Sequence, residues 1–412
     1  MKILFIHQNY PGQFKNLAPA LASLGHEVRG LRLGGTKEFV WENTQVTPYA
    51  IARTNTSGIH PWVEDLESKA IRGEACFKKA LDLRERGYNP DKIIAHHGWG
   101  ESLFLKEVWP DSRLGIYCEY FYTASGADVG FDPEFQSHEA DNACRISLKN
   151  LNNLANMNLS DAALSPTHWQ ADTFPDWFRD KITVIHDGID TGVLTPSLSV
   201  TAKMQNGPAL TRSEEIITFV NRNLEPYRGY HIFMRCLPKV LRDRPTARVI
   251  IVGSDDISYG ARPNAEKYGT KSWKQIFLEE VKPDLRPEDL ERIHFVGSVP
   301  YPTFIKIIQL SSVHVYLTYP FVLSWSLLEA MSVGCAIVAG DTQPVREVIK
   351  DQKTGILVDF FDPEKLSTAI TKLLGNTGLR AELGQNARNH IIKNYDLKDI
   401  CLPKQIAWVE DL

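Results

Sequence analysis

A chain of 412 residues is too long for one ordinary hydrophobic core, so its length predicts two or three domains. Its 43% hydrophobic and 23% charged residues and its net charge of −4 are typical of a soluble globular protein and exclude the basic excess of a nucleic-acid-binding protein. The six cysteines form no Cys-x-x-Cys pair, and no apolar run has the length of a signal peptide or a membrane helix. We therefore expect a cytoplasmic protein without a zinc site or a disulfide framework.

The chain opens with a strand, a turn, a helix and a second strand, predicted at 2–8, 9–13, 14–24 and 28–33. This order is typical of the dinucleotide-binding class of α/β folds. Gly12 lies in the turn, where the absence of a Cβ atom lets a ligand approach the backbone. The turn carries no Gly-x-Gly-x-x-Gly pattern, which disfavours a nicotinamide-dependent dehydrogenase.

Residues 69–86 predict an amphipathic helix rich in Lys and Arg. Two interpretations of its basic face stay open. The face is either solvated, or it contacts anionic lipid head groups or a charged acceptor, as in a peripheral membrane protein.

Polar side chains follow two of the next predicted strands. The strand at 91–95 ends in His96 and His97, and the strand at 114–117 leads to Glu119. Ligands of open parallel sheets bind beyond the carboxyl ends of the strands, so we expect these side chains to contact substrate. A satisfied core histidine is the alternative for either imidazole.

An aromatic loop follows, with Tyr122 at its start and 123–135 as its body. It forms either an acceptor wall or a packed surface loop. Residues 191–213 contain Pro, Ser, Thr and Gly without periodicity, and we place the interdomain linker there. The predicted domains are 1–205, 206–395 and a C-terminal helical segment at 396–412.

The second half repeats the opening order, with a strand at 216–220, a loop at 221–229 and a helix at 230–241. The next strand, 248–252, ends at Gly253. Further strands are predicted at 293–296, 313–317, 336–339 and 355–358, and further helices at 273–281, 302–311, 363–374, 379–394 and 400–409.

A predicted helix begins near Trp325, after a buried strand and a short loop, with Ser324 or Ser326 as its cap. Its free N–H groups and the positive end of its dipole make an anion site suited to phosphate. Glu329 lies one turn inside and can accept hydrogen bonds from sugar hydroxyls. The alternative is an ordinary strand–loop–helix unit with a solvated Glu329.

Arg222 and Arg228 lie on the loop after the first strand of the second half. Two guanidinium groups beside a helix N-terminus can clamp a diphosphate, and Gly229 lets the loop approach a ligand. The alternative is an exposed arginine pair. Together these groups suit the transfer of a sugar from a nucleoside-diphosphate sugar, because they stabilise the charge on the leaving diphosphate.

The chain resembles the glycosyltransferase family 4 group along nearly its whole length. The resemblance rests on Asn9-Tyr-Pro-Gly-Gln-Phe, Ile93-Ile-Ala-His-His-Gly-Trp, Val184-Ile-His-Asp-Gly-Ile-Asp and Leu327-Leu-Glu-Ala-Met-Ser-Val-Gly-Cys-Ala-Ile-Val. It implies an α/β protein of the GT-B fold, with two Rossmann-like, doubly wound parallel-sheet domains that face a cleft. It also implies retaining, metal-independent transfer from a nucleoside-diphosphate sugar to a glycan or lipid-linked acceptor, without a cofactor, in surface-glycan biosynthesis.

The resemblance also implies roles for individual residues. The catalytic set is His96, Glu329 and Arg228, with His96 on the donor sugar and His97 as its competitor. Glu329 would hold the ribose. The donor site comprises Gly12, Arg222, Arg228, Gly253, Leu323, Ser324, Trp325, Ser326 and Glu329, and the acceptor side comprises His97, Glu119 and Tyr122. The resemblance leaves the oligomeric state open.

Three departures from the family pattern bear on this assignment. Phe321 stands where the family usually has a Glu that contacts the donor sugar, and Val322 and Ser324 replace loop glycines. Arg222 is one residue farther from Arg228 than the usual Arg-to-Lys spacing. The alternatives are therefore a catalytically inactive GT-B scaffold, a glycan-binding partner or a sugar-nucleotide epimerase.

Overall fold

The computed structural model describes residues 1–135, 141–203 and 209–412, which form two compact units. The first unit comprises Met1–Gly188 and Leu397–Leu412, and the second comprises Ile189–Asp396. The second unit thus begins before the domain limit placed at residue 205. Leu194, Val200 and Leu210, which we assigned to a linker, are buried in the core of the second unit. The described residues of the predicted linker are therefore anchored in the second unit, and residues 204–208, on which the predicted domain limit falls, lie outside the described residues.

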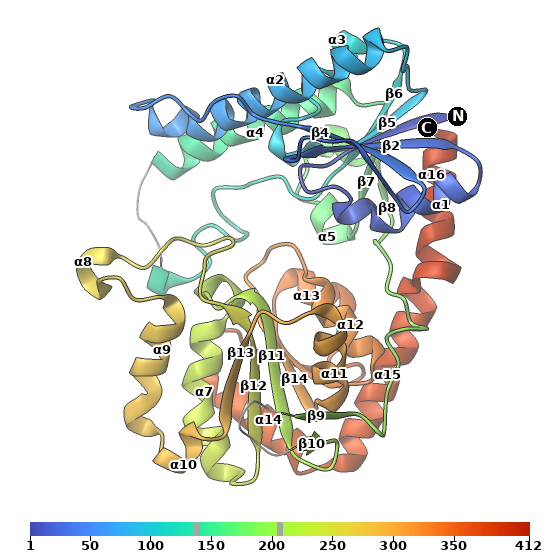
Figure 1. The fold of residues 1–412 in the computed structure, drawn as a ribbon. Helices are drawn as coiled ribbons and strands as arrows, with labels where there is room; N and C mark the ends of the chain where they lie inside the picture. Colours follow the sequence, from blue (N-terminus) through green and yellow to red (C-terminus); the bar gives the residue numbers. More distant parts are fainter. Residues whose placement is uncertain (136–140, 204–208) are drawn as a thin grey trace. The chain divides into compact units, whose positions relative to one another are not determined.

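The first unit is built on an eight-stranded sheet in the order β3-β4-β2-β1-β5-β6-β7-β8 (Figure 1). Every neighbouring pair is parallel except β3 and β4, which form an antiparallel edge. Its strands are β1 (Lys2–Ile6), β2 (Glu27–Leu33), β3 (Phe39–Trp41), β4 (Thr44–Tyr49), β5 (Lys92–His96), β6 (Arg113–Tyr117), β7 (Ala162–Ser165) and β8 (Ile182–Val184).

Helices cover both faces of this sheet, as the side chains of β1 show. Ile3 and Phe5 pack in one apolar cluster with side chains of α1 and α16, whereas Leu4 and Ile6 pack in another with side chains of α2. Successive residues of a strand point to opposite faces, so β1 is buried on both sides. The helices are α1 (Leu17–Ser23), α2 (Glu64–Glu85), α3 (Leu105–Val108), α4 (Asp141–Leu159), α5 (His168–Ala171), α6 (Asp176–Arg179) and α16 (Leu402–Asp411), with short turns η1 (Gly12–Lys15), η2 (Pro61–Val63), η3 (His97–Trp99), η4 (Pro133–Phe135) and η7 (Leu397–Cys401).

The basic helix α2 is less solvated than its composition suggests. Lys69 is 7% exposed, and burial lowers its pKa to about 8. Arg72 donates to the side chain of Gln8, and Lys78 pairs with Glu74 at 2.7 Å. The solvated-face interpretation is thus wrong for Lys69, which is buried in the first unit. None of the helices that the structure describes is long and apolar enough to cross a membrane.

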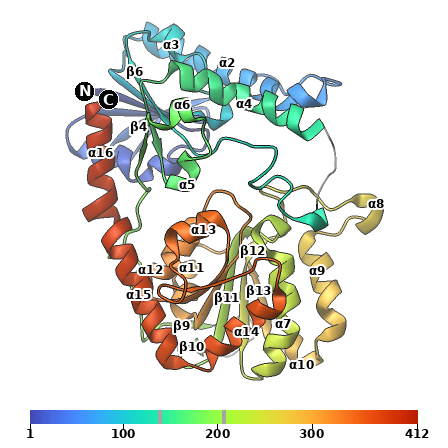
Figure 2. The same cartoon turned by 180° about the vertical axis from the view of Figure 1, so that it is seen from behind.

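The second unit has a six-stranded, wholly parallel sheet in the order β13-β12-β11-β14-β15-β16 (Figure 2). Phe219 stacks on Phe233 of α7 at 4.4 Å on one face, while its neighbour Val220 packs in the cluster that contains Leu327 of α12. The strands are β11 (Ile216–Asn223), β12 (Arg248–Ser254), β13 (Ile293–Gly297), β14 (Val313–Tyr316), β15 (Ala336–Gly340) and β16 (Ile356–Val358), and β9 (Thr201–Lys203) and β10 (Ala209–Thr211) form a separate pair.

The helices of the second unit follow the predicted order, and the ranges 273–281 and 363–374 agree with the structure. They are α7 (Tyr230–Asp243), α8 (Ala265–Tyr268), α9 (Trp273–Val281), α10 (Pro287–Leu290), α11 (Tyr301–Leu310), α12 (Trp325–Ser332), α13 (Gln343–Val348), α14 (Pro363–Leu374) and α15 (Thr377–Tyr395), with turns η5 (Pro226–Arg228) and η6 (Lys282–Asp284). The α/β class with two doubly wound parallel sheets is therefore confirmed.

Candidate functional site

Each sheet has one point at which the strand order reverses, and such a switch point opens a crevice at the carboxyl ends of the strands. In the first unit the switch point lies between β1, which is followed by His7, and β5, which ends in His96. In the second unit it lies between β11 and β14, and the loops after these strands carry Arg228 and Phe321. Topology therefore places most of the predicted site residues at two switch points, one in each unit.

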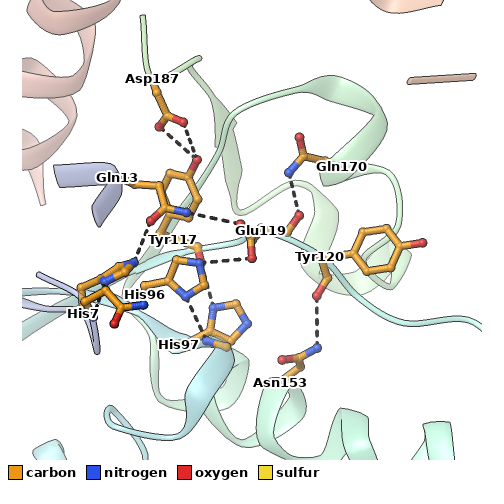
Figure 3. A network of polar contacts seen from close by, with 12 residues as sticks. His7, Gln13, His96, His97, Tyr117, Glu119, Tyr120, Asn153, Gln170 and Asp187 are labelled. Carbon is orange, nitrogen blue, oxygen red and sulfur yellow. Dashed lines mark hydrogen bonds and ion pairs between the residues drawn. The ribbon is translucent and has the colours of Figure 1, made fainter. Parts of the chain in front are cut away.

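Glu119 is the centre of a polar network in the first unit (Figure 3). Its Oε2 lies 3.4 Å from Nε2 of His96, and its Oε1 accepts a hydrogen bond of 3.3 Å from Nε2 of Gln13. The Gln13 oxygen in turn lies 2.7 Å from Nε2 of His7. The side chain of Glu119 keeps 33% of its surface exposed, whereas that of His96 keeps 1%. The carboxylate is thus the member of this pair that is open to a ligand.

Two backbone amides determine the direction of these contacts. The N–H of Asn9 donates to Nδ1 of His7 at 2.9 Å, and the N–H of Gly98 donates to Nδ1 of His96 at 3.3 Å. In a neutral imidazole one nitrogen accepts and the other donates, so Nε2 carries the proton in both rings. Both histidines therefore direct an N–H group toward Glu119, one directly and one through the amide of Gln13.

Aromatic packing fixes the imidazole of His96. The ring stacks on Trp99 with centroids 4.0 Å apart and on Tyr117 with centroids 5.5 Å apart. Tyr117 donates its hydroxyl proton to the carboxylate of Asp187, with both oxygens at 3.0 Å. The site thus rests on side chains held by ring stacking and by a buried Tyr–Asp bond.

The environment lowers the pKa of both His7 and Glu119. Burial, together with the charge of His96, lowers the pKa of His7 to about 3. Burial raises the pKa of Glu119, but the hydrogen bond from His96 and the other neighbouring imidazoles outweigh burial, so that pKa lies below its ordinary value. Glu119 is an anion and His7 is neutral at pH 7.

The remaining predicted acceptor residues are His97, which stacks beside His96, and Tyr122. His97 is 1% exposed, and its Nδ1 contacts the carbonyl oxygen of Tyr117 at 2.9 Å. Burial lowers the pKa of His97 to about 4. The ring of Tyr122 lies 3.7 Å from Nζ of Lys149. The structure thus brings His96 and Glu119 together and places His97 in the interior, with its Nδ1 on a backbone oxygen.

Gly12 has a structural reason to be glycine. Its φ of +50° lies in the left-handed region, and a Cβ atom would lie 2.3 Å from Nε2 of His7. The glycine therefore makes room for the His7 ring, and its approach to a ligand stays a prediction. The sequence interpretation missed His7 and Gln13, although polar residues directly after the first buried strand were a usable signal.

In the second unit, Arg228 is buried, with 5% of its surface exposed, and it connects two loops. Its Nη1 donates to Oγ1 of Thr318 at 2.7 Å and to the carbonyl oxygen of Val322 at 3.0 Å. Its guanidinium carbon lies 4.8 Å from the ring centre of Tyr259. Arg222 is exposed. The two predicted clamp residues thus differ sharply in burial, and Arg228 also shapes the loop before α12.

Glu225 is a third residue that the sequence interpretation missed. It is fully buried, and its carboxylate accepts hydrogen bonds from the backbone N–H groups of Ser258, Tyr259 and Gly260 at 3.1, 3.3 and 3.0 Å. Burial raises the pKa of Glu225 more than these bonds lower it. The carboxylate holds the loop that presents Tyr259 to Arg228.

Helix α12 begins as predicted. The Ser324 side chain accepts a hydrogen bond from the N–H of Ser326 at 3.3 Å, and the N–H of Ser324 donates to the hydroxyl of Tyr316 at 2.9 Å. Glu329 is 7% exposed and accepts a hydrogen bond of 2.7 Å from the hydroxyl of Tyr301. Glu329 is thus a buried, oriented acceptor, and the interpretation as a solvated carboxylate is wrong.

Phe321 is 7% exposed and packs edge-on against Tyr227 at 5.2 Å. Its ring also lies 5.2 Å from that of Tyr259. The surface at Phe321, called the apolar wall below, is therefore apolar, whereas a Glu side chain at this position would present a charge.

Gly253 has a φ of +151°, and a Cβ atom there would lie 2.8 Å from Leu224.

Comparison with known families covers both halves of the chain. Residues 25–194 match the Glycosyl transferase family 4 group, and residues 202–390 match the Glycosyl transferases group 1. These matches, with the fold and the two switch-point sites, show that the chain belongs to the glycosyltransferase family 4 group.

Individual relatives are similar over parts of the chain. The uncharacterized glycosyltransferase MJ1069 of Methanocaldococcus jannaschii is 37% identical over 124 residues, which cover 27% of this chain and 32% of that protein. The D-inositol 3-phosphate glycosyltransferase of Acidothermus cellulolyticus is 26% identical over 218 residues, which cover 52% of this chain and 45% of that protein. The chain thus matches between about a third and a half of the length of these two curated relatives.

Two solved structures align over the whole chain. Sucrose-phosphate synthase from Thermosynechococcus elongatus has a TM-score of 0.75 and 17% identity, and covers 100% of this chain and 98% of its own. Anabaena HepE in complex with UDP has a TM-score of 0.67 and 15% identity, with full coverage of both chains. At this identity the likeness concerns the fold, and it confirms the predicted GT-B class.

Proposed function

We propose that the protein is a retaining, metal-independent glycosyltransferase that moves a sugar from a UDP-sugar to a hydroxyl of a glycan or lipid-linked acceptor, in surface-glycan biosynthesis. The observation that carries the proposal is the start of α12 at the second switch point, where Arg228 and Glu329 are buried and oriented. Solved HepE structures with UDP and with UDP-glucose support a uridine nucleotide as the donor.

The second unit would bind the donor. The positive end of the α12 dipole and the guanidinium of Arg228 favour the diphosphate, since both attract an anion. Arg222 would add a second, solvent-exposed contact, and Glu329 would accept from the ribose hydroxyls beside its bond to Tyr301. Further backbone contacts are proposed along Leu323, Ser324, Trp325 and Ser326, and at Gly253.

These groups act on the step in which the bond to the diphosphate breaks. Negative charge then accumulates on the leaving phosphate oxygens, and oriented N–H donors stabilise it without rearranging. We assign no covalent nucleophile, which fits front-face transfer with retention of configuration. His96 remains the proposed contact of the donor sugar.

The first unit would bind the acceptor. Glu119 is the proposed contact of the acceptor hydroxyl, because its carboxylate is partly exposed and ionised. Tyr122 and the loop after it would extend this surface. We further propose that the basic helix α2 contacts a membrane surface peripherally and that the protein is cytoplasmic.

The test is incubation of the pure 412-residue chain with UDP-glucose, UDP-N-acetylglucosamine and UDP-galactose, with release of UDP measured. Products formed with simple alkyl glycosides as acceptors are then examined by NMR for the anomeric configuration. The proposal expects UDP release from one donor and a retained anomer. An inverted product, or UDP binding without any turnover, contradicts it.

A second candidate is a non-catalytic GT-B scaffold, which the apolar wall at Phe321 favours. Phe321→Glu separates the two candidates. A scaffold stays inert toward all three donors in both forms. A transferase whose donor choice depends on this wall changes its order of preference among the donors.

A further inference from the structure

We propose that His7 and Gln13 are positioning residues of the acceptor site, which hold Glu119 as a fixed anion whose remaining lone pairs take a hydrogen-bond donor from the acceptor. This inference rests on the proposed function, and it gives a role to two residues to which the sequence analysis assigned none. The acceptor group that it selects is a neutral hydroxyl or an ammonium group.

The first step is the geometry of the His7–Gln13 arm. The N–H of Asn9 occupies Nδ1 of His7, so the ring presents Nε2–H to the Gln13 oxygen at 2.7 Å. That bond sets the orientation of the Gln13 amide, which must then turn its NH2 group toward Glu119. Gln13 therefore presents an N–H donor, and never an acceptor, to the Glu119 carboxylate.

The second step is the convergence of two such arms. Figure 3 shows His96 and Gln13 approaching different oxygens of the Glu119 carboxylate. The Gln13 hydrogen bond uses part of the lone-pair capacity of Oε1, Nε2 of His96 faces Oε2 at 3.4 Å, and a third of the side-chain surface stays open. The open part can only accept hydrogen bonds as long as the carboxylate stays ionised.

The third step is the set of charges around this carboxylate. The groups that face or adjoin Glu119 are His7 after β1, Gln13 on η1, His96 at the end of β5, His97 on η3, Tyr117 on β6 with its partner Asp187, and Gln170 of α5 on the Glu119 carbonyl oxygen. The Asp187 carboxylate is engaged by the Tyr117 hydroxyl. The side chains that contact Glu119 are thus N–H donors, which favour its anionic form.

The consequence is a rule for acceptor recognition. A carboxylate or phosphate on the acceptor would meet a fixed negative charge at this point and be repelled. A hydroxyl or an ammonium group would gain a charge-assisted bond. The acceptor atom placed against Glu119 is therefore uncharged or cationic, whatever groups the acceptor carries elsewhere.

The experiment measures the titration of Glu119 in the full chain labelled with 13C at the glutamate carboxyl carbon. The Glu119→Gln variant identifies the signal. Gln13→Glu replaces an N–H donor with a second carboxylate, so we expect the Glu119 midpoint to rise by about one pH unit or more. His7→Phe keeps a ring beside Gly12 but removes the arm, and we expect a smaller rise in the same direction.

Gln385→Glu is the matched control, because it adds the same charge at an exposed position of the second unit. It should leave the Glu119 midpoint unchanged, and thermal unfolding checks that every variant is folded. A midpoint that moves by less than about 0.3 pH units in both arm variants overturns the inference. A midpoint at or above that of an ordinary glutamate in the wild-type protein overturns it as well.

Turnover separates this inference from the proposed function. Absence of UDP release by the wild-type chain counts against the transferase, whereas an unshifted Glu119 counts against the positioning arm. With an acceptor in hand, Glu119→Gln should lower kcat/KM for that acceptor about 10- to 100-fold, with UDP affinity unchanged. Arm variants should move the acid limb of the pH profile by the same amount as the Glu119 midpoint, which a purely structural role does not predict.

Discussion

Replacement of Arg228 by Ala tests whether a buried guanidinium organises the loop before α12. Arg228 donates two hydrogen bonds, to Thr318 and to the carbonyl oxygen of Val322, and its surface is 5% exposed. A hydrogen bond that involves a charged group contributes about 1.5–3 kcal/mol, so two give about 3–6 kcal/mol. The avoided cost of burying the guanidinium offsets part of this sum, and we expect a net loss of about 2–4 kcal/mol.

Chemical denaturation of the full chain measures this loss, and peptide-resolved hydrogen exchange locates it, because two units need not unfold together. Arg222→Ala is the matched control, since an exposed arginine should change stability by less than about 0.5 kcal/mol. UDP affinity should fall in both variants, by about 1.5–3 kcal/mol for Arg228. Equal stability of the two variants, or unchanged exchange at 317–324 in Arg228→Ala, would refute the reasoning.

Three further changes have defined outcomes. Gly12→Ala should lower the free energy of unfolding by about 2–3 kcal/mol, because the new Cβ atom strains a positive φ and overlaps the His7 ring. In a double-mutant cycle measured by thermal unfolding, adding His7→Ala should restore part of this loss. Burial lowers the pKa of His97 and of His314 to about 4, so the unfolded chain binds more protons than the folded chain below the ordinary pKa of 6.5. The melting temperature should therefore fall as the pH drops from 6.5 to 4 and stay level above pH 6.5. A melting temperature that rises as the pH drops from 6.5 to 4 would contradict this prediction. Glu329→Gln should weaken UDP binding about 10-fold in calorimetry while the fold is kept, and normal affinity would remove the carboxylate from the ribose site.

Most of the architecture was predictable from hydrophobic pattern. Buried parallel strands read as short apolar runs, and β1, β5 and β14 were found within one or two residues of their limits. Their carboxyl ends carried His96 and the loop before α12, so the two switch-point sites followed from position alone.

Other parts depend on contacts that local sequence does not encode. β3 and β4 were missed, because a short edge pair gains its stability from one neighbouring strand. The segment after Ile189 looked like a linker, since its apolar anchors are irregularly spaced. His97 and Lys69 looked available in the sequence, and only the packed structure shows that both are buried.

The direction of the His7–Gln13 arm lay equally beyond the sequence. Which ring nitrogen carries a proton depends on the backbone N–H of Asn9, and this contact exists only after the turn has folded around Gly12. The sequence therefore identified Glu119 as a candidate site residue, but it did not show that Gln13 and His96 orient the Glu119 carboxylate.

The central claim is that the second unit binds a nucleoside diphosphate at the start of α12. Thermal unfolding of the full chain with UDP, GDP, ADP, CMP and NAD tests it most directly. We expect UDP, at about 100 times its dissociation constant, to stabilise the protein by roughly 2.7 kcal/mol, and Glu329→Gln to reduce this effect. No shift with any diphosphate, or an equal shift in the variant, would contradict it.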